Sequence, residues 1–205
     1  MSESNKELVA SVNELKQTLG GMTRRSESVV IFIDNTNLNL TVRRVDTQGQ
    51  FRLCYKKLTE HLTAGRTLQQ CRIYYSDHSR DAMLSSEEAA RRKERDGFYA
   101  WLKYQGYWLK AMSLVDRGDG VTKEKGLDAS ITKDLERLSH SRVANTIVLV
   151  SGDADYQELV SEVQALYGIK VEVAFFQEYT AKTLQVAATQ FIDLTKVKDA
   201  LRRVA

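Results

Sequence analysis

The sequence predicts an α/β fold in which a mainly parallel sheet of about five strands lies between two layers of helices. Apolar segments without polar alternation recur along the chain, which is typical of strands that are buried on both faces. Segments with helical spacing separate them, and this alternation of strand and helix is typical of parallel sheets. A chain of 205 residues is long enough for one domain with a full core.

Residues 1–27 are predicted to form an N-terminal amphipathic helical extension, and residues 28–205 the α/β domain. The extension carries one apolar stripe, made of Leu8, Val12, Leu15 and Leu19. A lone helix of this length is marginal in water. We therefore expect it to dock on the domain or to make a contact with a partner, of which a homodimer is the simplest case.

Five strands and three helices can be placed by pattern. The strands are expected at residues 28–34, 71–77, 107–116, 146–150 and 170–176. The clearest helix follows Ser85, which forms a capping-box pattern with Glu88, and Gly106 ends it. Two further helices are expected within residues 123–138 and 156–168. The stretch 42–58 is expected to hold a loop or a short hairpin.

Charge and composition exclude several classes of protein. The net charge is +3, from 30 basic and 27 acidic residues, which is mild for a nucleic-acid binder. No segment has the length of a membrane span, so a cytoplasmic protein without membrane contact is expected. The two cysteines and three histidines show no spacing of zinc ligands. Phosphate-binding glycine loops and the G-x-S-x-G motif of acyl transfer do not occur.

Aspartates follow the apolar strands. Asp34, Asp77, Asp116 and Asp153 each stand at the end of a predicted strand. Since the ends of parallel strands share one edge of the sheet, these residues are expected on one side of the molecule. Taken singly, Asp77 and Asp116 fit solvated loop residues. Asp34 and Asp153 follow the longest apolar strands, which we expect to be central and adjacent.

The acids of two further pairs could have a structural role instead of a role in a functional site. In the turn that contains Asp153 and Asp155, one acid can cap the following helix, and we expect Asp155 to do so. In the helix near residue 130, Asp128 and Asp134 flank the buried stripe on opposite sides. Asp128 also suits the positive end of the helix dipole, and Asp134 also suits a salt bridge at the helix rim.

Carboxylates that converge at one edge repel one another unless protons or cations relieve the repulsion. Hard divalent cations prefer oxygen ligands, which makes Mg²⁺ or Mn²⁺ the expected ion. A metal-loaded acidic edge is suited to hydrolysis of a phosphate ester.

The motifs "FIDNTNL", "KGLDASITKDL", "LVSGDADYQEL" and "FIDL" resemble, in this order, the LabA-like NYN domains, a branch of the PIN-like nucleases. The resemblance spans about residues 28–194. It implies a PIN-like three-layer α/β/α sandwich and a ribonuclease that depends on Mg²⁺ or Mn²⁺. The implied catalytic residues are Asp34, Asn37, Asp128, Asp153 and Asp155. The four aspartates among them are also the implied metal ligands, and Asp134 is a possible auxiliary acid. The chain departs from the common pattern at Ala154, Tyr156 and Glu158.

An RNA substrate requires basic side chains beside the acids. Lys123, Lys125 and Arg80 are expected to contact phosphates. Stacking on bases is a further role for aromatic residues, with Tyr74, Tyr75, Tyr104 and Trp108 as candidates, although packing in the core also suits them. Two alternatives to an endoribonuclease stay open, namely a non-catalytic regulatory module that binds RNA or protein, and a small-molecule phosphatase.

Overall fold

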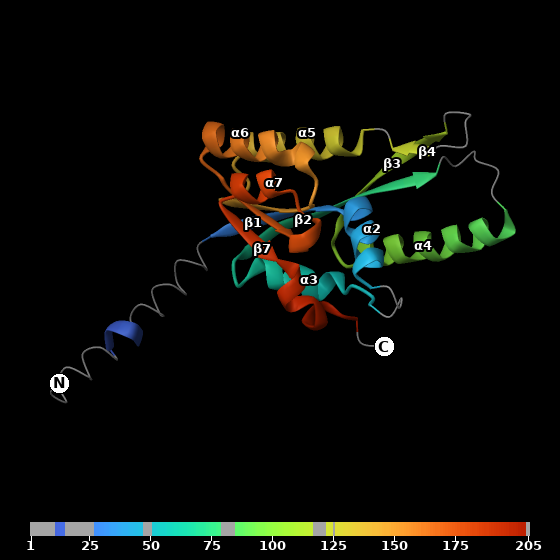
Figure 1. Cartoon of the computed structure of the whole chain (residues 1–205), viewed down its shortest axis with the longest axis horizontal. Coiled ribbons are helices and arrows are strands. Elements are labelled where there is room, and N and C mark those ends of the chain that lie inside the picture. The colour runs from blue at the N-terminus through green and yellow to red at the C-terminus, as the bar shows by residue number, and fades with distance from the viewer. Residues whose placement is uncertain are drawn as a thin grey trace.

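The computed structural model describes residues 11–14, 27–46, 51–78, 85–116, 122–124 and 126–203. Its strands are β1 (Ser28–Asp34), β2 (Thr67–His78), β3 (Trp108–Asp116), β4 (Thr122–Glu124), β5 (Thr146–Val150), β6 (Lys170–Phe175) and β7 (Gln190–Asp193). Its α-helices are α2 (Asn35–Val45), α3 (Tyr55–Thr63), α4 (Ser86–Tyr104), α5 (Leu127–His140), α6 (Gln157–Tyr167) and α7 (Lys182–Ala187). Three 3-10 helices are η1 (Ala154–Tyr156), η2 (Gln177–Tyr179) and η3 (Leu194–Leu201). Figure 1 shows the sheet between two layers of helices, which confirms the predicted α/β sandwich.

In the described part of the chain, seven strands form one sheet in the order β4-β3-β2-β1-β5-β6-β7. Neighbouring strands are parallel throughout except for β3 and β4, which are antiparallel. The sheet thus has two strands more than the sequence predicts. These are β4 and β7, which are only three and four residues long. Such short strands carry too few residues for a periodic pattern to be recognised.

For the stretch 42–58, the described residues agree with the predicted loop and not with the alternative of a hairpin. The stretch contains the end of α2 and the start of α3, and among the described residues between them Leu53 makes an isolated bridge to Arg202. The first of these helices has several asparagine and threonine residues, which are weak helix formers. Packing against the sheet stabilises α2 despite this composition, so local pattern alone missed it.

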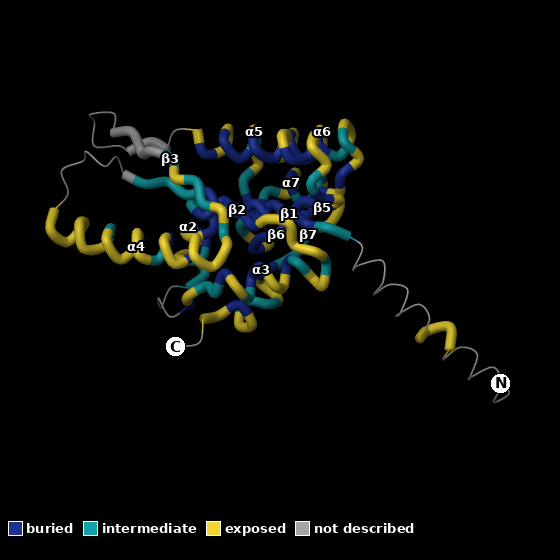
Figure 2. The backbone as a smooth tube through the Cα atoms, turned by 180° about the vertical axis from the view of Figure 1, so that it is seen from behind, coloured by how far each residue is buried: buried dark blue, intermediate teal, exposed yellow. Residues whose placement is uncertain are grey.

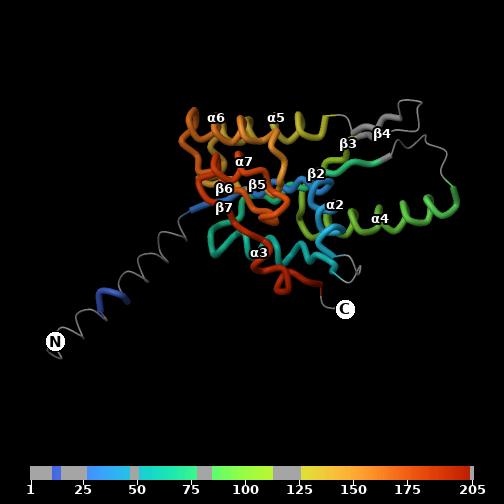
Figure 3. The backbone as a smooth tube through the Cα atoms, in the orientation of Figure 1, coloured from blue at the N-terminus to red at the C-terminus, as the bar shows by residue number. Residues whose placement is uncertain are grey.

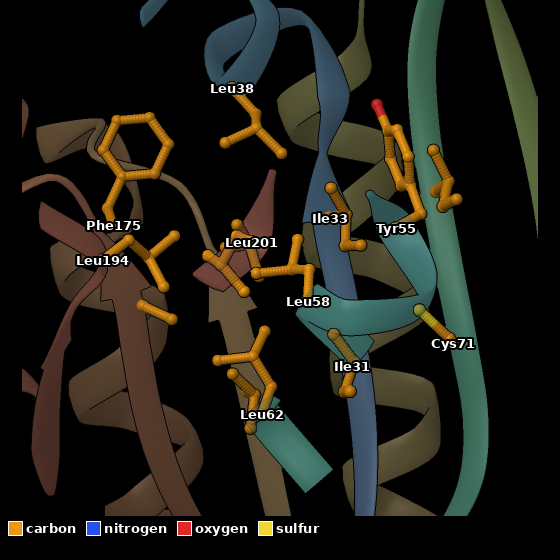
Figure 4. Packing of buried hydrophobic residues seen from close by; sticks show 14 of the residues in the cluster. Ile31, Ile33, Leu38, Tyr55, Leu58, Leu62, Cys71, Phe175, Leu194 and Leu201 are labelled. Carbon is orange, nitrogen blue, oxygen red and sulfur yellow. The ribbon is translucent and has the colours of Figure 1, made fainter. Parts of the chain in front are cut away.

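The central strand β1 is buried on both faces. Val29, Ile31 and Ile33 point to one face and join a cluster under α2 and α3, part of which is drawn in Figure 4. Val30 and Phe32 point to the other face and pack under α5 and α6. All five side chains are at most 1% exposed, and burial of each contributes about 1.5–3 kcal/mol to folding. Because β1 is packed on both faces, it holds its last residue, Asp34, in a fixed position at the edge of the sheet.

The helices form two layers. Figures 1 and 3 show α5 and α6 together on one side of the sheet, and α2, α3 and α4 on the other. Figure 2 shows that the central strands are the most buried part of the chain, whereas α4 exposes most of its length. The sheet edge at the carboxyl ends of the parallel strands is therefore bordered by helices of both layers.

The order of the strands reverses direction at β1. From β1 the chain adds β2 and β3 on one side, and it then returns to add β5, β6 and β7 on the other. Parallel sheets of this kind bind ligands outside the carboxyl ends of the two strands at which the order reverses. Those two strands are β1 and β5, which pair directly, as predicted.

The predicted N-terminal extension lies largely outside the described residues. Residues 11–14 are helical, and Val12 of the apolar stripe is 41% exposed, whereas Leu8, Leu15 and Leu19 are not described. Among the described helices, none is long and apolar enough to cross a membrane.

The turn after β5 requires a glycine. A Cβ atom on Gly152 would lie 2.2 Å from the carbonyl oxygen of Tyr179 and 2.6 Å from Cδ1 of Phe175. The Gly152 carbonyl oxygen also accepts a hydrogen bond of 3.0 Å from the amide of Ala181. The close approach to backbone on η2 and to a side chain on β6 fixes the position of the turn that carries Asp153.

We expect Gly152→Ala to lower the free energy of unfolding by about 2–3 kcal/mol, because the new methyl group overlaps backbone that cannot move away cheaply. The matched control is Gly97→Ala in the middle of α4, where no atom beyond the neighbouring residues and the backbone of the helix itself lies within 4 Å of the added Cβ. It should raise the same free energy by about 0.5–1 kcal/mol, because alanine favours a helix. Unfolding in urea, followed by circular dichroism, measures both. Equal stability of Gly152→Ala and wild type would contradict the close approach.

Candidate active site at the carboxyl edge of the sheet

Asp34 is the last residue of β1 and the N-cap of α2. Its Oδ1 accepts a hydrogen bond of 3.0 Å from the backbone amide of Asn37, and its Oδ2 accepts one of 3.2 Å from the hydroxyl of Ser151. The residue is only 3% exposed. Both oxygens are therefore held in place, and a carboxylate is fixed at the point where the strand order reverses.

Asn37 and Ser151 connect α2 to the turn after β5. The side-chain oxygen of Asn37 accepts a hydrogen bond of 3.1 Å from the amide of Gly152. The hydroxyl of Ser151 accepts one of 3.3 Å from the amide of Asp153, while it donates to Asp34. The structure thus places Asn37 among the predicted site residues, in contact with the backbone of the turn.

Asp153 caps the short helix η1, and Asp155 does not, which corrects the expectation from the sequence. The Oδ1 atom of Asp153 accepts a hydrogen bond of 3.1 Å from the amide of Asp155. Asp153 is half-buried, whereas Asp155 is exposed. The side chain of Asp155 borders a shallow depression that is also lined by Ala154, Gln157, Glu158 and Ser161. The physical reason is that the short helix η1 precedes α6. The first helical turn therefore begins earlier than the apolar spacing of α6 indicates, and its capping residue is Asp153, two residues before Asp155.

Asp128 approaches the same edge from the start of α5. Its Oδ1 accepts a hydrogen bond of 2.7 Å from the hydroxyl of Tyr156, whose residue is 1% exposed. Burial raises the pKa of this tyrosine far above its usual value, and the negative charges of Asp34 and Asp128 raise it further. The hydrogen bond to Asp128 and the charge of Asp153 act in the same direction. One buried hydroxyl therefore interacts with three predicted site acids, and it stays protonated as a donor.

Asp134 takes part in a separate cluster. It is 6% exposed, and it forms ion pairs with Lys110 at 3.2 Å, Arg72 at 3.5 Å and Arg137 at 3.5 Å. The hydroxyl of Tyr74 donates a further hydrogen bond of 3.0 Å to its Oδ2. These are the salt bridges that the sequence left open for Asp134. Asp134 and Arg72 are buried, whereas Lys110 and Arg137 are partly exposed, so only the pair with Arg72 lies fully inside the protein.

The other predicted residues are less completely described. Asp77 forms an ion pair with Arg95 of α4, so it is not a solvated loop residue. Lys123 lies in β4 opposite Val115 of β3, and its side chain is not described. Arg80 and Lys125 lie outside the described residues.

Two polar contributions to the site were not expected from the sequence. Ser151 follows the strand directly but was not assigned a role, and Tyr156 was assigned only to the buried stripe of α6. The tyrosine is buried as predicted, but its hydroxyl faces Asp128. A signal for both exists in the sequence, since each lies within two residues of Asp153 or Asp155 in the turn.

The chemistry of this edge suits a hard cation, because its charged ligand atoms are carboxylate oxygens. In the described ranges, however, no three His, Cys, Asp or Glu side chains are close enough together to form a ready-made metal site. The residues therefore fit an ion that takes few protein ligands and keeps several waters, as Mg²⁺ does. They do not fit an ion that needs a complete protein cage.

The cluster around Asp134 generates a prediction on pH. Burial is the largest effect on this carboxyl and would raise its pKa, but hydrogen bonds and charges from Lys110, Tyr74 and Arg72 outweigh it, so that the pKa is lowered from 3.8. Because the pKa is lower in the folded state, the charged carboxylate stabilises the fold at pH values above its ordinary pKa. This stabilisation is lost as the pH falls through the folded-state pKa.

We expect Asp134→Asn to lower the free energy of unfolding by about 2 kcal/mol at pH 7, because it leaves a buried Arg72 without its counter-charge. The difference from wild type should shrink as the pH falls below about 3.8. Glu136→Gln, on the exposed side of the same helix, serves as control and should change the stability by less than about 0.5 kcal/mol. If Asp134→Asn lowers the free energy of unfolding by the same amount at every pH, the ion pairs of Asp134 do not stabilise the fold in this way.

Comparisons with known proteins agree with the fold and the motifs. The NYN domain family matches residues 28–195. A solved structure of a protein of unknown function from Vibrio parahaemolyticus is similar, with a TM-score of 0.63 and 24% sequence identity, over 83% of this chain and 94% of that one. No curated protein matches. The family match spans most of the chain and confirms the resemblance seen in the sequence motifs, so this chain belongs to the NYN domain family.

Proposed function

We propose that this chain is a metal-dependent endoribonuclease that hydrolyses RNA phosphodiester bonds at the carboxyl edge of its sheet. The NYN family is a family of PIN-like nucleases, so nucleic acid is the substrate class that the family suggests. The observation that carries the proposal is the position of the Tyr156 hydroxyl. This hydroxyl donates a hydrogen bond to Asp128, and, in addition to its burial, the negative charges of Asp34 and Asp153, which come from two other elements, raise its pKa. Convergence of this kind at a sheet edge is typical of a functional site.

In this proposal Asp34 is the fixed acid of the site. Its two hydrogen bonds, from the amide of Asn37 and the hydroxyl of Ser151, prevent its carboxylate from turning. Asn37 acts as a positioning residue, because its side chain holds the amide of Gly152 and with it the turn that precedes Asp153. The site acids are thereby oriented before substrate binds, which lowers the cost of arranging them in the transition state.

Asp128 and Asp153 are the other two carboxylates that we propose for the site. The buried hydroxyl of Tyr156 holds one oxygen of Asp128, and the amide of Asp155 holds one oxygen of Asp153. A bound Mg²⁺ or Mn²⁺ would take its few protein ligands from Asp34, Asp128 and Asp153 and would keep several waters, because these acids do not form a ready-made site of three ligands in the described residues. The ion would lower the pKa of bound water and offset the charge of the phosphate. The exposed carboxylate of Asp155 is suited to orienting a water molecule beside the scissile phosphate.

Basic side chains would hold the substrate. Lys123 lies in β4, which pairs with the last residues of β3 at the carboxyl edge. Together with Lys125 and Arg80 it is proposed to contact phosphates of the RNA, and such contacts do not depend on base sequence.

One observation favours a second candidate, a non-catalytic module of the same fold that binds RNA or protein. The acids already accept hydrogen bonds from the protein, and no ready-made site of three ligands occurs in the described parts of the chain. Cleavage of RNA that is stimulated by metal separates the two candidates.

The test is Asp153→Asn. The amide keeps the size of the side chain and its hydrogen bond to Asp155 but removes one negative charge. Cleavage of a labelled single-stranded RNA in saturating Mn²⁺ should fall by at least about a hundredfold, equivalent to about 3 kcal/mol of transition-state stabilisation. In EDTA the variant should melt at a higher temperature than wild type, because repulsion within the acidic cluster is relieved.

Asp96→Asn is the matched control, since it removes the same charge from the exposed surface of α4, on the other face of the sheet. It should cleave at the rate of wild type. If wild type cleaves no RNA in Mn²⁺ or Mg²⁺, or if Asp153→Asn cleaves as fast as wild type, the ribonuclease proposal is wrong.

A further inference from the structure

The sheet extends beyond α5 on the side of β3, and this leaves part of its surface exposed. Trp108, Lys110 and Met112 alternate along β3 and face the layer of α5, whereas Leu109 packs on the opposite face. Trp108 is 38% exposed, and the side chain of Lys110 is 34% exposed. We define the α5–β3 surface as Arg72, Trp108, Lys110, Asp134 and Arg137.

The α5–β3 surface carries an excess of positive charge. Three of its members are cations, and all three form ion pairs with the same carboxylate, that of Asp134. Its formal charge is therefore +2, the sum of three positive charges and one negative. Arg137 exposes 62% of its side chain, and Lys110 about a third, so both can reach a ligand in solvent. This charge attracts phosphate groups.

The indole of Trp108 is held in a fixed orientation. The guanidinium carbon of Arg72 lies 4.5 Å from the ring centroid, and the ring of Tyr74 lies 5.6 Å away at a tilt of 54°. Arg72 is only 5% exposed, so it supports the indole and is not accessible to a ligand. A rigid aromatic ring that is partly exposed beside accessible cations is the arrangement on which proteins stack the bases of single strands.

The α5–β3 surface leads toward the acidic site. Asp134 follows Asp128 by six residues on α5, which corresponds to a rise of about 9 Å along the helix. Along β3, Met112 follows Lys110 by two residues, and its Cε lies 3.8 Å from the position of a Cβ on Gly126, the N-cap of α5. The surface thus runs beside α5 toward the turn from which Asp128 projects.

We infer that single-stranded RNA binds along the α5–β3 surface, with a base stacked on Trp108 and phosphates bound by Lys110 and Arg137. This inference rests on the proposed ribonuclease function and specifies its substrate as an unpaired strand. The exposed indole argues for a single strand and against a duplex, because a base in a duplex is already stacked on its neighbours. Of the other candidate aromatic residues, Tyr74 is fully buried and Tyr75 stacks on Tyr99. Tyr104 is 87% exposed, but it lies at the end of α4, in the helical layer on the other face of the sheet (Figure 1).

The two tryptophans of the chain allow a direct test. In Trp101→Phe, Trp108 is the single reporter, and in Trp108→Phe the reporter is Trp101, which is 50% exposed on α4. A short oligouridylate is added in EDTA, so that no metal-dependent cleavage occurs. We expect RNA to quench the fluorescence of Trp101→Phe in a saturable manner and to leave that of Trp108→Phe unchanged. Quenching of Trp101 alone, or of neither residue, would overturn the inference.

A second measurement tests the two cations. Lys110→Gln combined with Arg137→Gln should weaken binding of the same RNA and should reduce the slope of log K against log salt by about 1.4, or about 0.7 for each phosphate that is no longer neutralised. Lys56→Gln on α3 is the control on the other face of the sheet, where the lysine forms an exposed pair with Glu60. Melting curves establish that each variant is folded. Equal slopes for the double variant and the control would overturn the binding of phosphates by these two side chains.

The outcomes separate this inference from the proposed function. Metal-dependent cleavage by wild type without quenching of Trp108 would support the ribonuclease proposal and contradict RNA binding at the α5–β3 surface. Quenching of Trp108 without any cleavage would support RNA binding at the α5–β3 surface and contradict the ribonuclease proposal. If a duplex of the same length quenches Trp108 as strongly as the single strand, base stacking on the indole is wrong.

Discussion

The buried carboxylate of Asp34 is the constraint on which the rest of the site depends. A carboxylate that is 3% exposed is costly unless hydrogen bonds compensate for the lost water. Here the compensating donors come from two parts of the chain, the first turn of α2 and Ser151 beyond β5. Satisfying this one side chain therefore joins the ends of β1 and β5. It also fixes the turn in which Asp153 and Asp155 lie, and the close approach of Gly152 to Phe175 and Tyr179 fixes the same turn from the other side.

Tyr156 links this edge to the helical layer above it. Its ring packs in the core, and its hydroxyl donates to Asp128 at the start of α5. A phenylalanine could fill the same space, but it would leave Asp128 without a donor, so the hydroxyl has a role that packing alone does not require. On the opposite flank of α5, Asp134 is neutralised by cations. One helix thus carries Asp128 of the acidic cluster on one flank and Asp134 of the α5–β3 surface on the other. This charge distribution would suit the metal ion and the RNA of the proposed function.

Much of the fold could be predicted from the sequence because its central strands are long and apolar. β1 begins and ends where the pattern places it, and Asp34 and Asp153 follow adjacent strands as expected. The short strands β4 and β7 have too few residues for a pattern, and α2 is stabilised by contacts distant in sequence. Within the site, residue types indicated the acids, but the roles of Ser151 and Tyr156 depend on hydrogen bonds between elements far apart in sequence. Such bonds, like the ion pairs of Asp134 with Arg72 and Lys110, follow from tertiary packing, so the sequence indicates which residues lie near the site but not which partners they find.

The central claim is that acids from separate elements act on one divalent cation. Its most direct test is a titration of the chain with Mn²⁺, in which electron paramagnetic resonance measures the unbound ion. We expect saturable binding that Asp128→Asn weakens by at least about tenfold, while Glu136→Gln on the same helix leaves it unchanged. Asp128→Asn retains an acceptor for Tyr156, so that a loss of binding reports the charge and not the fold. Absence of Mn²⁺ binding by the wild-type chain, or equal binding by all three proteins, would contradict the claim.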